Sequence, residues 1–271
     1  MFSIANKSVD IEGLKIAYKD EGGGQILLCL HALGHSSKDF NSIYGLQLNN
    51  FRVISIDFPN HGNSGSAKEA ISATYLYQIT AKFIEKLDLK NIIVIGNSIG
   101  GAVAIRLASN NPNIKMLSLS NPAGLDKRGL FFRPFLDYMI HFFKQGVQKK
   151  PNFKKSFSNY YHKVLTSKTA SERRNEIIQE CYSIAPLLVE VWTSFKLDSE
   201  DLRPIISTVN CPVLFTWGMD DKFVQFSRNK QAIEKFSNYK LIKYQIGHTP
   251  YIECPVLFLN DLIEYMSQSF N

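Results

Sequence analysis

Ser98 occupies the centre of the segment G-N-S-I-G at residues 96–100, and this is the clearest chemical signal in the chain. The segment follows the largely apolar run 91–95 and precedes the helix-like residues 101–108. A strand that ends in G-x-S-x-G and turns into a helix is typical of a nucleophile elbow, which presents the serine hydroxyl at the edge of a sheet. Glycines flank the serine because strand and helix approach too closely there for side chains. We therefore expect Ser98 to be a nucleophile.

A serine hydroxyl is a weak nucleophile at neutral pH and needs a base, which a carboxylate in turn orients. After a nucleophile elbow, the expected chain order is an acid following a later strand and then a histidine near the C-terminus. Asp220 and Asp221 follow the predicted strand 213–217, and His248 follows the predicted strand 241–246. Because each stands at the carboxyl end of a predicted parallel strand, we expect these residues at the same sheet edge as the serine.

An oxyanion hole is the second requirement, because the tetrahedral intermediate of acyl transfer needs hydrogen-bond donors. One donor is expected to be the backbone N–H of Ile99, which follows the nucleophile, and the other should come from the loop after an early strand. The predicted strand 26–30 runs into such a loop at residues 31–34, where Leu33 is the natural donor. The sequence thus predicts an oxyanion hole formed by the N–H groups of Leu33 and Ile99.

Short strand-like runs alternate with amphipathic, helix-like ones along the chain. Six runs are rich in β-branched and aromatic residues, as in parallel strands that are covered on both faces: 26–30, 53–57, 92–95, 116–120, 213–217 and 241–246. The helix-like stretches are 74–87, 102–108, 226–236 and 256–266. This alternation predicts an α/β fold, with a mostly parallel, twisted sheet and helices on both of its faces.

Residues 122–210 interrupt this alternation, because they contain no obvious strand. Within them, residues 131–143 and 153–165 repeat apolar side chains along one helix face. We interpret the interval as a helical cap inserted over the carboxyl edge of the sheet, where such insertions usually form a lid over a site. The core domain is then expected to comprise residues 1–121 and 211–271.

Four further blocks accompany the serine motif: H-A-L-G at 31–34, D-F-P-N-H-G-N-S at 57–64, W-G-M-D-D at 217–221 and G-H-T-P-Y-I-E at 247–253. Together they resemble the α/β-hydrolase family, in its group of capped serine esterases, lipases and haloperoxidase-like enzymes, over nearly the whole chain apart from the cap. The resemblance implies an α/β-hydrolase fold. It also selects Asp221 over Asp220 as the acid of the triad, because the family block reads W-G-x-x-D.

The other histidines have different expected roles. His31 and His61 belong to the loops of the family blocks, and we expect them to stabilise these loops by hydrogen bonds. His35, His141 and His162 show no partner pattern, so we expect them on the surface or in the cap. No H-E-x-x-H and no paired Cys/His spacing is present, so we expect no metal site. We expect no cofactor either.

The net charge of +7 is concentrated in residues 144–174, which hold nine Lys or Arg residues and one acid. This segment is most simply the solvated face of the cap helices, and the alternative is a basic surface that contacts anionic lipid or steers an anionic substrate. No nucleic-acid-binding motif accompanies the charge, so no nucleic-acid partner is expected. No signal peptide or membrane-spanning run is visible, which predicts a cytoplasmic protein. The oligomeric state stays open.

These features predict a serine hydrolase that cleaves a carboxylic ester, thioester or related acyl compound through an acyl-enzyme. The aromatic residues of the cap are expected to pack against the core or, alternatively, to line a pocket for a hydrophobic acyl substrate. A carbon–carbon bond hydrolase of the meta-cleavage type is one other candidate, since those enzymes resemble this chain in G-N-S-x-G-G. A non-hydrolytic small-ligand receptor that keeps the pocket and triad is a candidate from a different class.

Overall fold

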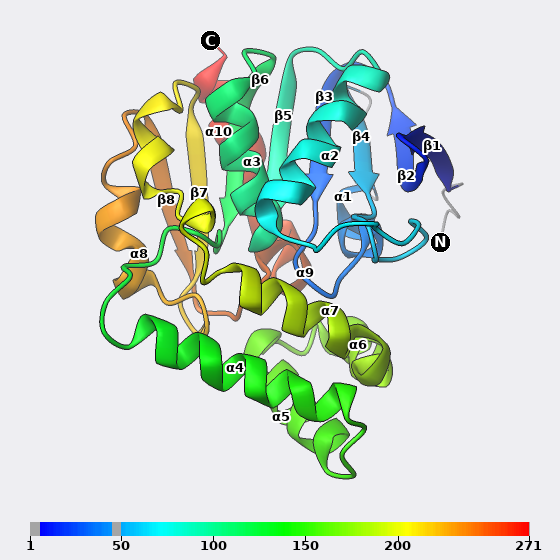
Figure 1. Cartoon of the computed structure of the whole chain (residues 1–271). Coiled ribbons are helices and arrows are strands. Elements are labelled where there is room, and N and C mark those ends of the chain that lie inside the picture. Colours follow the sequence, from blue (N-terminus) through cyan, green and yellow to red (C-terminus); the bar gives the residue numbers. More distant parts are fainter. Residues whose placement is uncertain (1–5, 45–49, 271) are drawn as a thin grey trace.

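The computed structural model describes residues 6–44 and 50–270, and eight strands in it form one sheet (Figure 1). The strand order is β1-β2-β4-β3-β5-β6-β7-β8, with antiparallel pairing of β1 with β2 and of β2 with β4 and parallel pairing elsewhere. The strands are β1 Lys7–Ile11, β2 Leu14–Gly22, β3 Gln25–Leu30, β4 Phe51–Ile56, β5 Ile92–Asn97, β6 Ile114–Ser120, β7 Val213–Gly218 and β8 Tyr239–Tyr244. The predicted mostly parallel α/β sheet is confirmed.

Helices cover both faces of the sheet because its central strands are apolar on both sides. In β5, Ile92 and Val94 belong to the core under α2 and α3, whereas Ile93 and Ile95 belong to the core under α1 and α10. Successive side chains of a strand point to opposite faces, so an unbroken apolar run needs two covering layers. The helices of this core are α1 Asn41–Tyr44, α2 Ala73–Lys86, α3 Ile99–Asn110, α8 Phe226–Ile233, α9 Pro250–Glu253 and α10 Pro255–Ser269.

The structure differs from the sequence prediction at the two edges of the sheet. All six predicted strands are present, but β1 and β2 are additional. Their residues mix lysine and acidic side chains with apolar ones, because these strands lie at the sheet's antiparallel edge with part of their surface exposed. At the opposite edge, β8 ends at Tyr244 rather than at residue 246, because Ile246 has left the ladder and its carbonyl accepts from Asp220 N at 2.9 Å.

The interval between β6 and β7 folds as helices: α4 Phe132–Val147, α5 Phe153–Val164, α6 Ser171–Gln179 and α7 Cys181–Ser194. Residues 122–210 contain no strand, and α4 to α7 share an apolar core of their own that includes Phe143 and Phe157. We call residues 122–210 the insertion. Its two ends meet, because Leu202 N donates to Gly124 O at 2.9 Å. The division into a core domain and a cap domain at these boundaries stays a prediction.

Helices α4 to α7 of the insertion lie beyond the carboxyl ends of the parallel strands, which point toward α4 and α7 in Figure 1. This is the edge at which the loops after β3, β5, β7 and β8 carry the predicted site residues. All four cysteines are free, and Cys29 is buried in β3. Within residues 6–44 and 50–270, no helix is both long enough and apolar enough to cross a membrane. The signal-peptide prediction rests partly on residues 1–5, which lie outside the described residues.

Candidate active site

Ser98 forms the turn between β5 and α3, and its backbone is strained. Its φ of 53° and ψ of −117° lie outside the regions that L-residues ordinarily adopt. Close approaches shape the turn: a Cβ on Gly96 would lie 2.6 Å from Gly100 O, and one on Gly100 would lie 2.2 Å from Leu30 O. Only glycine fits at these two positions, so the G-x-S-x-G spacing reflects the packing of α3 against the strand ends.

Asp221 and His248 meet at the same edge of the sheet. His248 Nδ1 donates to Asp221 Oδ2 at 2.6 Å, and the Asp221 side chain is fully buried. Three further donors reach this carboxylate: Asn121 Nδ2 at 2.9 Å, Phe223 N at 2.8 Å and Val224 N at 3.1 Å. The four hydrogen bonds hold the carboxylate in one orientation. The carboxylate fixes the proton of His248 on Nδ1, which leaves Nε2 as a hydrogen-bond acceptor and potential base.

The backbone of His248 is held both by β5, the strand that precedes Ser98, and by the insertion. Asn97, which precedes Ser98 at the end of β5, donates from Nδ2 to His248 O at 2.9 Å. His248 N donates to Val164 O, at the end of α5, at 2.7 Å. The elbow, the histidine loop and the insertion are therefore joined by direct hydrogen bonds, which is how residues from distant parts of the chain are placed together.

A buried carboxylate, that of Glu253, secures the same loop. It accepts five hydrogen bonds, of 2.7 to 3.2 Å, from the N–H and hydroxyl groups of Thr166 and from the N–H groups of Ser167, Gly247 and Thr249. Two of these donors flank the site histidine in sequence, and three belong to the insertion just after α5. Glu253 therefore ties the insertion to the histidine loop.

The two predicted oxyanion donors also lie at this edge. Ile99 is the first residue of α3, where a backbone N–H has no partner within the helix. Leu33 follows β3, in a loop whose next N–H, that of Gly34, donates to His61 Nε2 at 3.1 Å. The start of α3 packs directly against the end of β3, as the close approach of Gly100 to the backbone of Leu30 shows. The role of Leu33 and Ile99 as oxyanion donors stays a prediction.

His31 and His61 stabilise loops by hydrogen bonds, as predicted. His31 Nδ1 donates to Ala32 O at 2.7 Å and its Nε2 accepts from Phe58 N at 3.0 Å, while His61 Nδ1 donates to Pro59 O at 2.8 Å. Burial lowers the pKa of His61 to about 4 and lowers the pKa of His31 well below its usual value. Both imidazoles are therefore neutral near pH 7 and serve as structural donor–acceptor pairs.

His35 is buried, so the expectation of a surface or cap position was wrong for this residue. Its Nδ1 lies 2.6 Å from Asp39 Oδ2, and Arg173 of α6 reaches the other oxygen of Asp39, Oδ1, at 2.7 Å. These paired charges hold the pKa of Asp39 well below its usual range, although burial alone would raise it. Asp39 belongs to the 3₁₀ helix Ser37–Phe40 after β3 and lies only four residues beyond His35, whereas Arg173 comes from α6, so the local sequence does not reveal the contact with Arg173. His141 and His162 are exposed, as expected.

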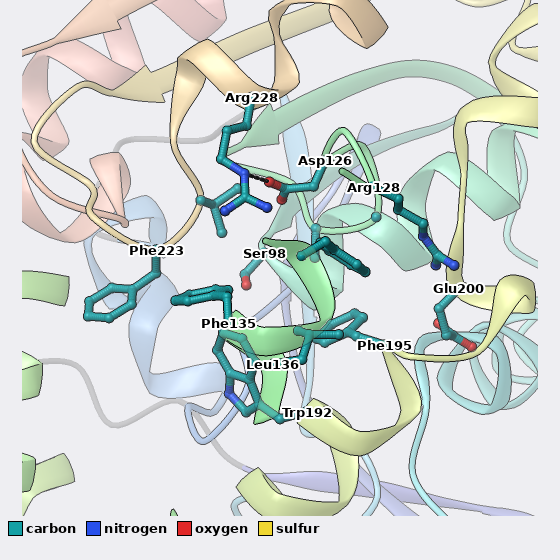
Figure 2. Close-up of a pocket in the computed structure, with 14 residues that line it drawn as sticks. Ser98, Asp126, Arg128, Phe135, Leu136, Trp192, Phe195, Glu200, Phe223 and Arg228 are labelled. Carbon is teal, nitrogen blue, oxygen red and sulfur yellow. Dashed lines mark ion pairs between the residues drawn. The ribbon is translucent and has the colours of Figure 1, made fainter. Parts of the chain in front are cut away.

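A pocket that is partly open to solvent is lined by Ser98 and by apolar side chains of the insertion. Figure 2 shows Phe135, Trp192 and Phe223 around the serine hydroxyl. α4 and α7 contribute most of this wall, and their helical spacing turns one aromatic stripe toward the sheet. Aromatic residues of the insertion therefore line a pocket, which was the alternative to simple packing.

The opposite wall of the pocket is charged. Arg228 Nε lies 3.0 Å from Asp126 Oδ1, and Figure 2 shows this ion pair beside Ser98. Burial raises the pKa of Asp126 to about 6. Arg128 also lines the pocket, but it pairs with Asp198 at 3.1 Å. The cavity thus combines an apolar wall with a polar end whose charge changes near pH 6.

Three residues that organise the site received no role from the sequence. Asn97 and Glu253 lie inside motifs that the sequence analysis identified, but the motifs do not show which groups these side chains bond. Asn121 follows β6 with a φ of 40°, a conformation that asparagine tolerates better than most residues, and this position after a buried strand was the available signal. Of the two candidate acids, the structure places Asp221 against His248, while Asp220 uses its backbone N–H to bind Ile246 O.

Comparisons with known proteins agree with this architecture. The chain is 24% identical to the uncharacterized hydrolase YugF of Bacillus subtilis (strain 168), over 94% of this chain and 96% of that protein. It is 25% identical to a protein of Mycoplasma genitalium provisionally named esterase/lipase 1, over 81% of this chain and 84% of that protein.

Solved structures show the same fold at lower identity. An esterase from Exiguobacterium antarcticum superposes with a TM-score of 0.81 at 20% identity, covering 95% of this chain and 97% of that one. A bromoperoxidase from Bacillus anthracis gives a TM-score of 0.79 at 21% identity, covering 97% of this chain and 100% of that one. Residues 25–255 match the family model described as alpha/beta hydrolase fold. The chain therefore belongs to the α/β hydrolase fold family.

Proposed function

We propose that this protein is a serine hydrolase that cleaves a carboxylic ester, thioester or related acyl compound through Ser98, His248 and Asp221. The observation that carries the proposal is the buried 2.6 Å hydrogen bond from His248 to Asp221 at the sheet edge where the strained Ser98 lines a pocket with an aromatic wall. A base oriented by a carboxylate beside a serine is the arrangement that activates a hydroxyl nucleophile.

In the proposed reaction, the Ser98 hydroxyl attacks the acyl carbon as His248 Nε2 takes its proton. The N–H groups of Leu33 and Ile99 donate to the tetrahedral oxyanion. His248 then returns the proton to the leaving alcohol or thiol, and an acyl-serine remains. A water molecule that loses its proton to the same imidazole attacks this ester, and the carboxylate leaves as the serine regains its proton. No cofactor takes part in this scheme.

The relatives support an acyl substrate. The Mycoplasma genitalium protein carries esterase/lipase in its name, and the Exiguobacterium antarcticum structure is described as an esterase. The aromatic wall formed by Phe135, Trp192 and Phe223 suits a hydrophobic acyl or alcohol group. We further propose that the protein acts in the cytoplasm.

The test combines active-site labelling with ester turnover. Wild type, Ser98→Ala and the exposed-serine control Ser207→Ala are treated with a fluorophosphonate probe, and the labelled peptide is mapped. The same proteins are assayed with p-nitrophenyl esters of increasing acyl length. We expect labelling at Ser98, and turnover that falls by at least about 10³-fold in Ser98→Ala but not in Ser207→Ala.

Two outcomes would contradict the proposal. A folded wild type that is not labelled and that turns over esters no faster than Ser98→Ala would favour the non-hydrolytic receptor. Labelling at Ser98 without turnover of any ester would remove esters from the substrate class and favour the carbon–carbon bond hydrolase.

A further inference from the structure

The segment 127–133, K-R-G-L-F-F-R, forms an exposed apolar tip between basic residues. Leu130 is 92% exposed and Phe131 is 81% exposed, more than any other large apolar side chain among the described residues. Lys127 and Arg133 beside them are exposed too. The exposure of two large apolar side chains to water is unfavourable, so it indicates that this tip contacts a partner surface.

Helix α4 continues this surface along its outer face. Phe131, Tyr138 and His141 recur at helical spacing on its solvent side, followed by Lys144. Residues 127–171 contain one acid, Asp137, and it forms an ion pair with Lys196. Ten basic residues oppose it, nine of them exposed: Lys127, Arg128 (half-buried), Arg133, Lys144, Lys149, Lys150, Lys154, Lys155, Lys163 and Lys168. The tip therefore belongs to a strongly positive part of the molecule.

A second exposed apolar surface, on α10, has the opposite electrostatic setting. Val256 is 69% exposed and Leu257 is 58% exposed. Helix α10 contains no lysine or arginine and carries the acids Asp261 and Glu264. Of these two surfaces, the tip at Leu130 is the one that combines apolar exposure with an excess of positive charge, and this combination is complementary to an anionic lipid surface.

We propose that the segment 127–133 inserts at the surface of an anionic lipid bilayer, with the lysines of α4 and α5 in contact with the headgroups. Leu130 and Phe131 enter the boundary between headgroups and acyl chains, and Lys127 and Arg133 remain among the phosphates. Arg128 and Phe132, on either side of these two apolar residues, line the pocket at Ser98. Binding thus brings the pocket to the bilayer surface, where acyl compounds are concentrated. This inference goes beyond the proposed hydrolysis.

The test measures binding without hydrolysis. Wild-type protein is sedimented with vesicles of phosphatidylcholine alone and with vesicles of equimolar phosphatidylcholine and phosphatidylglycerol. The tip variant Leu130→Ser/Phe131→Ser is compared with the matched control Val256→Ser/Leu257→Ser, which removes two apolar side chains of similar exposure elsewhere. All four side chains are exposed, so both variants should fold.

We expect wild type and the α10 control to bind the anionic vesicles and not the vesicles of phosphatidylcholine. Their affinity for the anionic vesicles should fall as the salt concentration rises. The tip variant should bind at least about tenfold more weakly, since it loses two inserted apolar groups. Turnover of a soluble short-chain ester should be the same in all three proteins, which separates this result from failure of the proposed function.

Two results would overturn the inference. One is wild-type protein that stays in the supernatant with anionic vesicles at low salt. The other is a tip variant that binds as tightly as wild type. If wild type and the tip variant bind anionic vesicles equally well, and also bind soluble polyglutamate equally well, the basic surface would be assigned to an acidic protein partner instead.

Discussion

At the scale of single residues, Ser98 stores backbone strain that can be measured. Its φ of 53° and ψ of −117° are readily adopted by glycine alone. Such strain costs about 1–3 kcal/mol, and glycine loses about 0.4–1 kcal/mol through its freer unfolded chain. We predict that Ser98→Gly raises the free energy of unfolding by about 1 kcal/mol in urea denaturation, whereas Ser98→Ala does not. Equal stability of the two variants would contradict this account.

The buried histidines make stability depend on pH. Burial lowers the pKa of His61 to about 4, so the unfolded chain binds a proton at this residue before the native chain does. The free energy of unfolding must then rise with pH between about 4 and about 6.5, and the contribution of His61 is lost as pH falls through this range. We predict that this titration lowers the free energy of unfolding of wild type by an amount on the order of 3 kcal/mol as pH falls from about 6.5 to about 4. His61→Gln should lack this decrease, so its plot of unfolding free energy against pH should be flatter. The exposed control His141→Gln should keep the wild-type slope.

Among the elements, the loop that carries His248 depends on a carboxylate that does not react. Glu253 accepts hydrogen bonds from both this loop and the segment after α5, and an amide in its place would face N–H donors with its own NH₂. We predict that Glu253→Gln lowers kcat by about tenfold to a hundredfold with little change in KM, because the histidine is displaced. Glu264→Gln, an exposed substitution on α10, is the control. A change in KM alone would show that the residue acts on substrate binding instead.

Helix α6 is attached to the core through a buried ion pair. Arg173 reaches Asp39, whose side chain is fully buried, and removal of the arginine would leave this carboxylate with one of its two charged partners, His35. We predict that Arg173→Met lowers the free energy of unfolding by roughly 3 kcal/mol. The double variant Asp39→Asn/Arg173→Met should recover part of this loss, and the exposed Lys168→Met should change little. A double variant less stable than the single one would contradict the explanation.

On the scale of the whole molecule, the insertion has a hydrophobic core distinct from the two cores of the sheet. Phe157 is fully buried in that core, and its truncation should cost about 3–5 kcal/mol. We predict that Phe157→Ala speeds amide hydrogen exchange in α4 to α7 well before it affects β5. Phe215→Ala, in the sheet, should speed exchange in the strands. Uniform acceleration throughout the chain by both variants would show that the molecule opens as one unit.

The sequence was most informative where local physics dictates the residue. The elbow glycines follow from close backbone approach, and the strands β3 to β7 follow from apolar runs that need two covered faces. The edge strands β1 and β2 left no such run. The ion pair of Arg173 with Asp39 joins residues 134 positions apart, and the bonds of Glu253 to Thr166 span 87 positions. No local periodicity encodes such contacts, so these parts of the site needed the three-dimensional structure.

The hydrogen bond from Leu202 N to Gly124 O joins the two ends of residues 125–201, so this segment leaves the sheet and returns to it at one place. A different helical segment could therefore replace residues 125–201 at this junction without changing the path of β6 or β7. A graft would replace most of the aromatic side chains that line the pocket with Ser98. The grafted module would have to meet three requirements: a carbonyl for His248 N, as Val164 supplies, backbone donors for Glu253, and a cation for Asp39. Modules that meet these requirements would leave Ser98, Asp221 and His248 in their present arrangement.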